Sequence, residues 1–199
     1  NKYSFIFTYA TSKNKQLYFI GSQEFETKLH QLELKHSLGT FWRFEGGSSL
    51  SKEDVNTENF TNQNYQIDAF NISPKFIFEY SKNHQFSFLY SFKNKKNMIS
   101  NMETLAQQKF GTSFYYKSKK KTLLRAEFNL LFNDFTGGSN SPVAYQMLAG
   151  LQSGRNATWS LLLQKKINSF INLHINYVGR KSENSSIIHT GSMQLRANF

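Results

Sequence analysis

The residues of this chain with side chains suited to chemistry include five histidines, His30, His36, His84, His174 and His189. They form neither an HExxH pair nor the spacing of a zinc site. A serine and a histidine on neighbouring strands could assemble a hydrolase, but no serine stands out as a nucleophile. We therefore expect no enzyme, no metal and no cofactor, and interpret the histidines as structural residues.

Ten charged residues share a position in the sequence pattern. Each lies on the polar side of a segment in which polar and apolar residues alternate. They are Glu33, Lys35, Arg43, Lys75, Glu79, Lys109, Arg125, Glu127, Lys166 and Arg196. Their mixed signs favour pairs across neighbouring strands, each worth ~0.2 to 1 kcal/mol. The alternative is a water-filled channel lined by these groups, for which a barrel of about ten strands leaves little room.

The alternation also defines the elements that must position these charges. From Leu32 to Phe44 the even positions are mostly apolar, and this period of two predicts a strand. At ~3.3 Å per residue the run is long enough to cross a membrane. Less regular alternation covers 17–25, and clear alternation recurs in 3–9, 70–80, 86–92, 110–116, 124–132, 159–163, 171–177 and 187–199. The sequence predicts an antiparallel up-and-down barrel of about ten strands, or the C-terminal part of a larger one.

Composition is consistent with strands that cross a membrane. The 199 residues include 20 Phe and 10 Tyr but only 2 Pro, which favours a pleated sheet. Mean hydropathy is -0.54, and no run of ~18 apolar residues could cross as a helix. A barrel has a polar average because its lipid-facing and lumen-facing residues alternate. We expect one domain over residues 1–199, and the absence of cysteine excludes disulfides and thiolate metal sites.

The formal net charge of +11 raises the question of nucleic acid. Its lysines crowd into Ser12–Lys15, Lys93–Lys96 and Lys117–Lys121, which we interpret as turns or loops. No nucleic-acid motif accompanies them, so we expect no nucleic-acid partner.

Connection lengths predict an orientation, because outer-membrane barrels have short periplasmic turns and longer extracellular loops. We predict short links at 26–28, 81–84, 117–121 and 168–169, and long ones at 46–64, 93–104, 134–155 and 179–186. A tight turn at 12–15 departs from this rule, since its position in the order makes it extracellular. Pro74 predicts a local bulge.

One extracellular loop is predicted to contain a short helix. Ser141 and Pro142 suit the N-cap and first turn, and Gly150 suits the end. Within it, Tyr145, Met147 and Leu148 must pack against the barrel mouth or a partner, since water would otherwise surround them.

The C-terminal strand carries a candidate assembly signal. Met193, Leu195 and Phe199 share its apolar side, and Phe199 is the last residue. An amphipathic final strand that ends in an aromatic residue resembles the signal read by the outer-membrane barrel-assembly machinery. We therefore expect this machinery as a partner during insertion.

The last third of the chain contains several short motifs: Ser141–Tyr145, Gly150–Gln152, Gly154–Asn156, Thr158–Trp159, Gly179–Ser182 and Ile188–Gly191. Together they resemble the closing region of large Bacteroidetes-type outer-membrane β-barrel proteins. The resemblance implies a much longer protein and offers no catalytic residues to transfer. It implies an outer-membrane location, and barrel topology predicts a periplasmic C-terminus.

The function expected from these features is that of a membrane anchor, or of an accessory, structural subunit of a cell-envelope complex. Its expected partners are lipopolysaccharide, phospholipid and other envelope subunits. One alternative is a porin-like transport channel. The other is a soluble β-sandwich that binds glycans.

Overall fold

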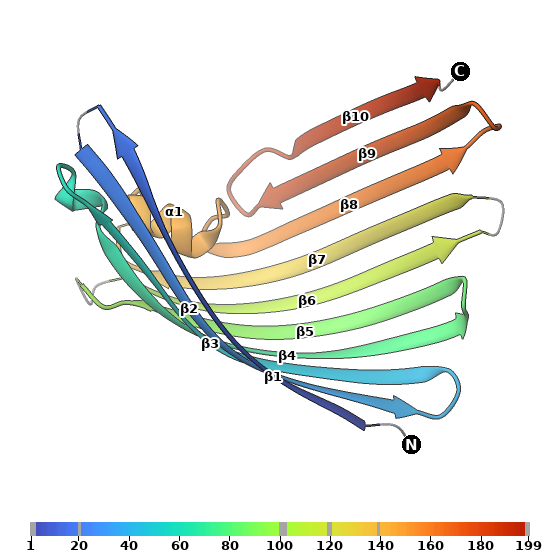
Figure 1. The fold of residues 1–199 in the computed structure, drawn as a ribbon, viewed down its shortest axis with the longest axis horizontal. Coiled ribbons are helices and arrows are strands. Elements are labelled where there is room, and N and C mark those ends of the chain that lie inside the picture. The colour runs from blue at the N-terminus through green and yellow to red at the C-terminus, as the bar shows by residue number, and fades with distance from the viewer. Residues whose placement is uncertain (1–2, 20, 100–102, 119–120, 139, 198–199) are drawn as a thin grey trace.

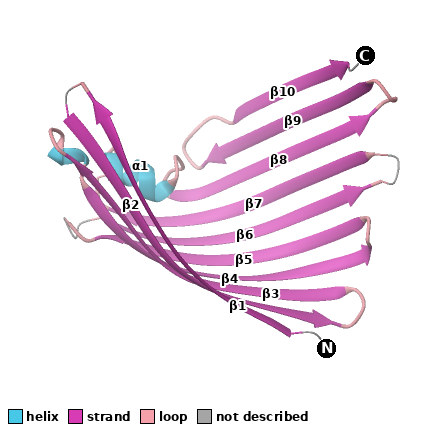
Figure 2. Cartoon of the chain, in the orientation of Figure 1, coloured by secondary structure: helices cyan, strands magenta, loops and turns pink. Residues whose placement is uncertain are grey.

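This computed structural model describes residues 3–19, 21–99, 103–118, 121–138 and 140–197. Within them one sheet holds ten strands: β1 (Tyr3–Tyr18), β2 (Gly21–Leu38), β3 (Trp42–Thr57), β4 (Tyr65–Ser81), β5 (His84–Asn97), β6 (Thr104–Lys117), β7 (Thr122–Thr136), β8 (Gly154–Lys166), β9 (Ile171–Ser182) and β10 (Ile188–Ala197). A short 3-10 helix, η1 (Thr61–Gln63), precedes β4, and the helix α1 (Pro142–Leu148) precedes β8 (Figure 2). No helix of the described part is long and apolar enough to cross a membrane.

The strands follow one another in chain order, each antiparallel to the next. This confirms the predicted up-and-down antiparallel architecture. The sheet is strongly curved, with α1 inside the curve and with β1 and β10 at its two edges (Figure 1). The pairings of the described residues run from β1 to β10 without joining these two edges.

The two faces of the sheet differ in composition, because successive side chains of a strand point to opposite faces. We call the face that α1 covers the concave face and the other the convex face. One row of directly paired convex residues crosses all ten strands: Tyr3, His36, Phe44, Phe76, Phe88, Thr112, Phe128, Trp159, Gly179 and His189. The neighbouring concave row is mostly polar: Ser4, Lys35, Glu45, Lys75, Leu89, Gly111, Asn129, Thr158, Arg180 and Ile188.

Helix α1 confirms the predicted helical turn. The Ser141 hydroxyl accepts a hydrogen bond from the Ala144 amide at 3.0 Å, which caps the first turn. The helix ends at Leu148, and the next residue, Ala149, has a left-handed φ of 53° that is followed by a second positive φ, of 73°, at Gly150. Both conformations turn the chain away from the helix axis toward β8.

The buried core lies where α1 meets the concave face. Met147 and Leu148 of the helix pack with sheet residues in one cluster that also holds Val55, Tyr65, Ile67, Leu105 and Val143. Met147 is 1% exposed and Leu148 4%, so these side chains pack on the sheet as expected. Tyr145 differs, because it points away and is 72% exposed.

Two of the predicted strands are placed differently. The run from Leu32 to Phe44 is two strands, since β2 ends at Leu38 and β3 begins at Trp42. Gly39, with φ +78°, begins the turn between them. The alternation continues through this turn because Leu38 and Trp42 are paired opposite each other and share the convex face. The irregular strand expected at 17–25 spans the real connection between β1 and β2.

Polar strand ends account for the misplaced turns. The predicted turns 12–15 and 26–28 lie inside β1 and β2 and pair with each other, as in Lys13 with Glu26. The expected loop 46–64 is strand as far as Thr57, and its Gly46 and Gly47 pair with β2 and β4. Backbone hydrogen bonds to neighbouring strands outweigh the turn-like composition of these segments.

The bulge predicted at Pro74 is also absent from the described pairings. Ile72 pairs with Phe92 and Lys75 with Leu89, so the register is the same on both sides of Pro74. The register shifts instead between Glu79 and Ser81. A proline lacks the donor of one ladder bond, and here the ladder is interrupted without an inserted residue.

Candidate functional site

All ten charged residues singled out from the sequence lie on the concave face. The strand register places them there, because residues two positions apart on a strand share a face. Lys109, for example, pairs with Leu131, and the pair two positions along the strands is Gln107 with Asn133, which faces α1. Asn133 in turn donates a hydrogen bond to the Gln152 carbonyl of the loop that carries α1. The sheet therefore gathers residues from β2 to β10 onto one polar wall.

Ion pairs on this wall occur on β2 to β4. Arg43 contacts Glu45 of its own strand at 3.0 Å and Glu79 of β4 at 2.6 Å. Lys35 contacts Glu33 at 3.4 Å. Among the described residues of this face, only the contact of Arg43 with Glu79 joins two strands. Most of the charges expected to pair across strands therefore form no such ion pair in the described part of the chain.

The wall from β5 to β10 has a different charge. Within the described residues of these strands its bases are Lys93, Lys95, Lys109, Lys117, Arg125, Lys166, Arg180 and Arg196, and its one acid is Glu127. Among the described residues no ion pair within 4.0 Å forms on these strands. Lys95 instead donates a hydrogen bond to the Met147 carbonyl of α1 at 3.1 Å. This part of the wall is strongly basic and largely unneutralised.

Sequence reasoning missed four bases of this wall, Lys93, Lys95, Lys117 and Arg180, and a fifth base beside it, Lys121. Lys93 and Lys95 lie in a lysine-rich segment whose composition predicts a turn or loop. Lys117 and Arg180 follow the alternation of β6 and β9 and could have been found by extending it. Lys121 lies in the turn before β7, where alternation gives no information about side-chain direction.

The convex face exposes large apolar side chains over its whole width. Phe5 is 66% exposed, Phe88 53%, Phe110 48% and Met193 73%. Leu195, the next convex residue on β10, is 62% exposed. Phe199, the third residue of the predicted assembly signal, lies outside the described residues.

Trp159 covers a glycine on this face. A Cβ on Gly179 would come within 2.2 Å of the Trp159 ring, so the indole lies directly on the backbone of β9. The Tyr177 hydroxyl accepts a hydrogen bond from Trp159 Nε1 at 3.4 Å and contacts His189 Nδ1 at 2.7 Å. His36 also contacts an aromatic side chain of this face, because its ring stacks on that of Tyr3 with the ring centroids 4.0 Å apart.

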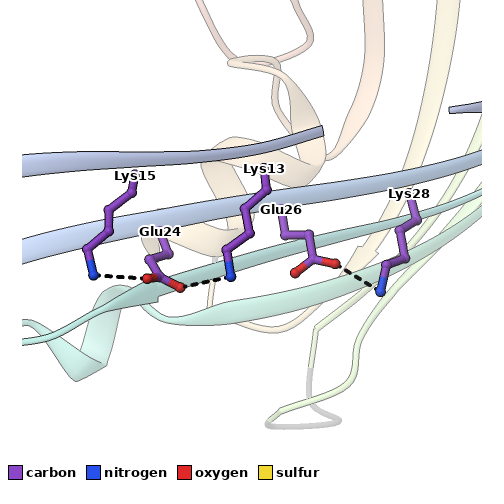
Figure 3. Close-up of polar contacts among 5 residues, drawn as sticks. All are labelled: Lys13, Lys15, Glu24, Glu26 and Lys28. Carbon is purple, nitrogen blue, oxygen red and sulfur yellow. Dashed lines mark hydrogen bonds and ion pairs between the residues drawn. The ribbon is translucent and has the colours of Figure 1, made fainter. Parts of the chain in front are cut away.

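Near the connection that joins β1 to β2, the convex face is charged instead of apolar (Figure 3). Glu24 contacts Lys15 at 3.0 Å and Lys13 at 3.4 Å, and Glu26 contacts Lys28 at 2.9 Å. The hydrogen bond from Lys15, with the charge of Lys13, holds the pKa of the Glu24 carboxyl below its usual range. The apolar band therefore ends before the strands do, and a charged extension lies beyond it.

Comparison with known proteins finds a structural likeness. No family model and no curated protein matches the chain. Among solved structures, the chain is similar to the translocator domain of the autotransporter NalP from Neisseria meningitidis, with 9% identity and a TM-score of 0.49 over 97% of this chain and 73% of that one. None of these comparisons points to Bacteroidetes-type proteins in particular.

Proposed function

We propose that this chain contributes ten strands to a transmembrane β-barrel of the bacterial outer membrane. The observation that carries the proposal is the convex face, which exposes large apolar side chains on strands from β1 to β10, among them Phe5, Phe76, Phe88, Phe110, Phe128 and Met193. A soluble sheet of this size would leave that contiguous surface in water, which soluble proteins avoid. Lipid on the convex side and polar groups on the concave side match the alternation of such barrels.

Within that membrane we propose an anchor or accessory subunit of an envelope complex, without enzymatic activity. The packing of α1 on the concave face supports this choice, because the helix narrows the space inside the curve. A transport channel is the second candidate, and the basic wall of β5 to β10 favours it. A soluble glycan-binding sandwich has less support, since the described strands form one sheet and a sandwich needs two.

The orientation follows from the connections. The links 39–41, 82–83, 118–121 and 167–170 lie at one end of the sheet, which we place in the periplasm with the C-terminus. The connections at the opposite end are 58–64, 98–103, 137–153 and 183–187, and each is longer than the links at the first end. The connection between β1 and β2, also at the opposite end, is the exception because it is short. Lipopolysaccharide and phospholipid would then contact the convex band, and the assembly machinery would capture the exposed edge of β10.

Membrane fractionation tests the proposal. The chain, targeted to the outer membrane of a bacterial host, should stay in the membrane pellet after alkaline carbonate and enter solution only with detergent. Release by carbonate alone would contradict the membrane-spanning assignment. Planar-bilayer recordings of the detergent-purified protein then separate the two roles, since an anchor should show no steady conductance and a channel should show unitary steps.

A further inference from the structure

We propose that the concave face binds a multivalent oxyanion, such as pyrophosphate or a phosphate ester, at the short-turn end of β8 to β10. A depression of about 450 Å³ lies there, lined among others by Lys121, Gln164, Lys166, His174, Gln194 and Arg196. The inference does not rest on the membrane location, because the depression is formed by strands and one turn of this chain.

The chemistry of the lining favours an anion. Lys121, Lys166 and Arg196 are cations, and the two glutamine side chains can donate hydrogen bonds from their amides. The described residues that line the depression include no carboxylate. Lysine, arginine and amide donors that converge without a competing acid form the donor set that phosphate groups require.

Two further observations point to a ligand. The Lys166 amide donates to the Lys121 carbonyl at 3.1 Å, so two lysines are held side by side and repel each other. Like charges held together in this way are stabilised by an anion between them. In addition, the Nε2 atom of His174 is shielded from solvent and has no hydrogen-bond partner among the described residues.

The other half of the same face shows why the site lies here. Arg43 and Lys35 already contact glutamates, so an added anion would have to displace a carboxylate. The bases around the depression have no such described neighbour in the lining. A multivalent oxyanion gains from several cations at once, whereas chloride or acetate contacts one or two.

Calorimetric titration of the detergent-purified chain with inorganic pyrophosphate tests the site. Wild type should bind it more tightly than acetate, and the Lys166→Gln/Arg196→Gln double variant should lose about tenfold or more in affinity. The matched control is Lys75→Gln, which removes a cation of the same face outside the depression and should bind as wild type does. Succinate, a dicarboxylate, shows whether the site prefers phosphate over other dianions.

Several outcomes would overturn the inference: no pyrophosphate binding by wild type, equal binding by the double variant, or an equal loss in Lys75→Gln. The turn variant Lys121→Gln provides a second route if the double variant fails to fold, since Lys121 is exposed and outside the strands. It should weaken binding about threefold without changing the circular dichroism spectrum. Unchanged binding in Lys121→Gln would mean that the turn is not part of the site. If the double variant also fails to fold, this result would count against the proposal.

Discussion

The convex and concave faces are formed by the same ten strands yet follow opposite rules. Along β7, Phe128 faces outward in the apolar row, and Asn129, the next residue, faces inward among polar groups. On the convex face the side chains are large and exposed. On the concave face small and charged residues leave hollows, and a cluster of buried apolar residues lies under α1. The difference teaches that the face on which a strand residue lies decides which substitutions the fold tolerates. Because the two faces alternate along a strand, neighbouring residues tolerate different substitutions.

The largest effect should separate these two neighbours. Phe128→Arg places a charge in the middle of the apolar band and should reduce the free energy of unfolding by about 2 to 4 kcal/mol in a bilayer. Asn129→Arg places the same charge beside Glu127 on the concave face and should cost much less. Urea titration of both variants in lipid vesicles measures the difference. Equal losses would break the assignment of the two faces.

A smaller and more local effect is expected under α1. Met147→Ala empties a fully buried position and should reduce the local stability of the helix by about 2 kcal/mol, the low end for such a truncation, since a loop can relax. Tyr145→Ala, on the exposed side of the same helix, should change little. Amide hydrogen exchange of residues 142–148 reports the loss. Similar exchange in both variants would mean that α1 is not held by its concave contacts.

The contact between Trp159 and Gly179 sharpens the description of the convex face. Gly179→Ala inserts a methyl group where the indole lies and should cost about 1 to 2 kcal/mol through overpacking. Gly191→Ala is the control, because the nearest atoms to its Cβ would be 3.9 Å away. Tryptophan fluorescence and urea midpoints of the two variants give the comparison. A shift in the control as large as in Gly179→Ala would argue against a specific indole contact.

The smallest effect distinguishes the two halves of the concave face. Arg43→Gln removes the contacts with Glu45 and Glu79 and should cost roughly 0.5 to 1 kcal/mol, because the partners are about one-third exposed and screened. Lys93→Gln, on the basic half, should cost nothing or slightly stabilise. The loss in Arg43→Gln should shrink in high salt. A loss that salt leaves unchanged would mean packing, and not charge, accounts for the role of Arg43.

Much of this arrangement could be predicted because period two is preserved wherever a strand has one apolar side. The alternation placed Lys75 and Glu79 on one face and Phe76 and Phe78 on the other without any knowledge of pairing. The turn at Gly39 was not predicted, because the alternation continues across it. A connection of three residues joins Leu38 to Trp42, and both lie on the convex face. Periodicity therefore reports faces better than strand ends.

Other features depend on contacts that a single strand does not reveal. The polar segment around Lys13 and Glu26 looks like two turns, but each becomes strand through the ladder it forms with the other. The basic depression combines a turn residue, Lys121, with Lys166 and Arg196, and alternation places only the latter two. Which charges find partners was also beyond sequence, because it depends on register between strands.

The meander has one further consequence, which concerns the two edges. Neighbouring strands alternate in direction, so β1 and β10 run opposite ways, and β1 begins at the same end of the sheet at which β10 finishes (Figure 1). Closure into a cylinder preserves an all-antiparallel arrangement if the edges meet directly or through an even number of added strands. An odd number would create one parallel pair in the closed cylinder. Parity thus restricts the barrels that this sheet can complete.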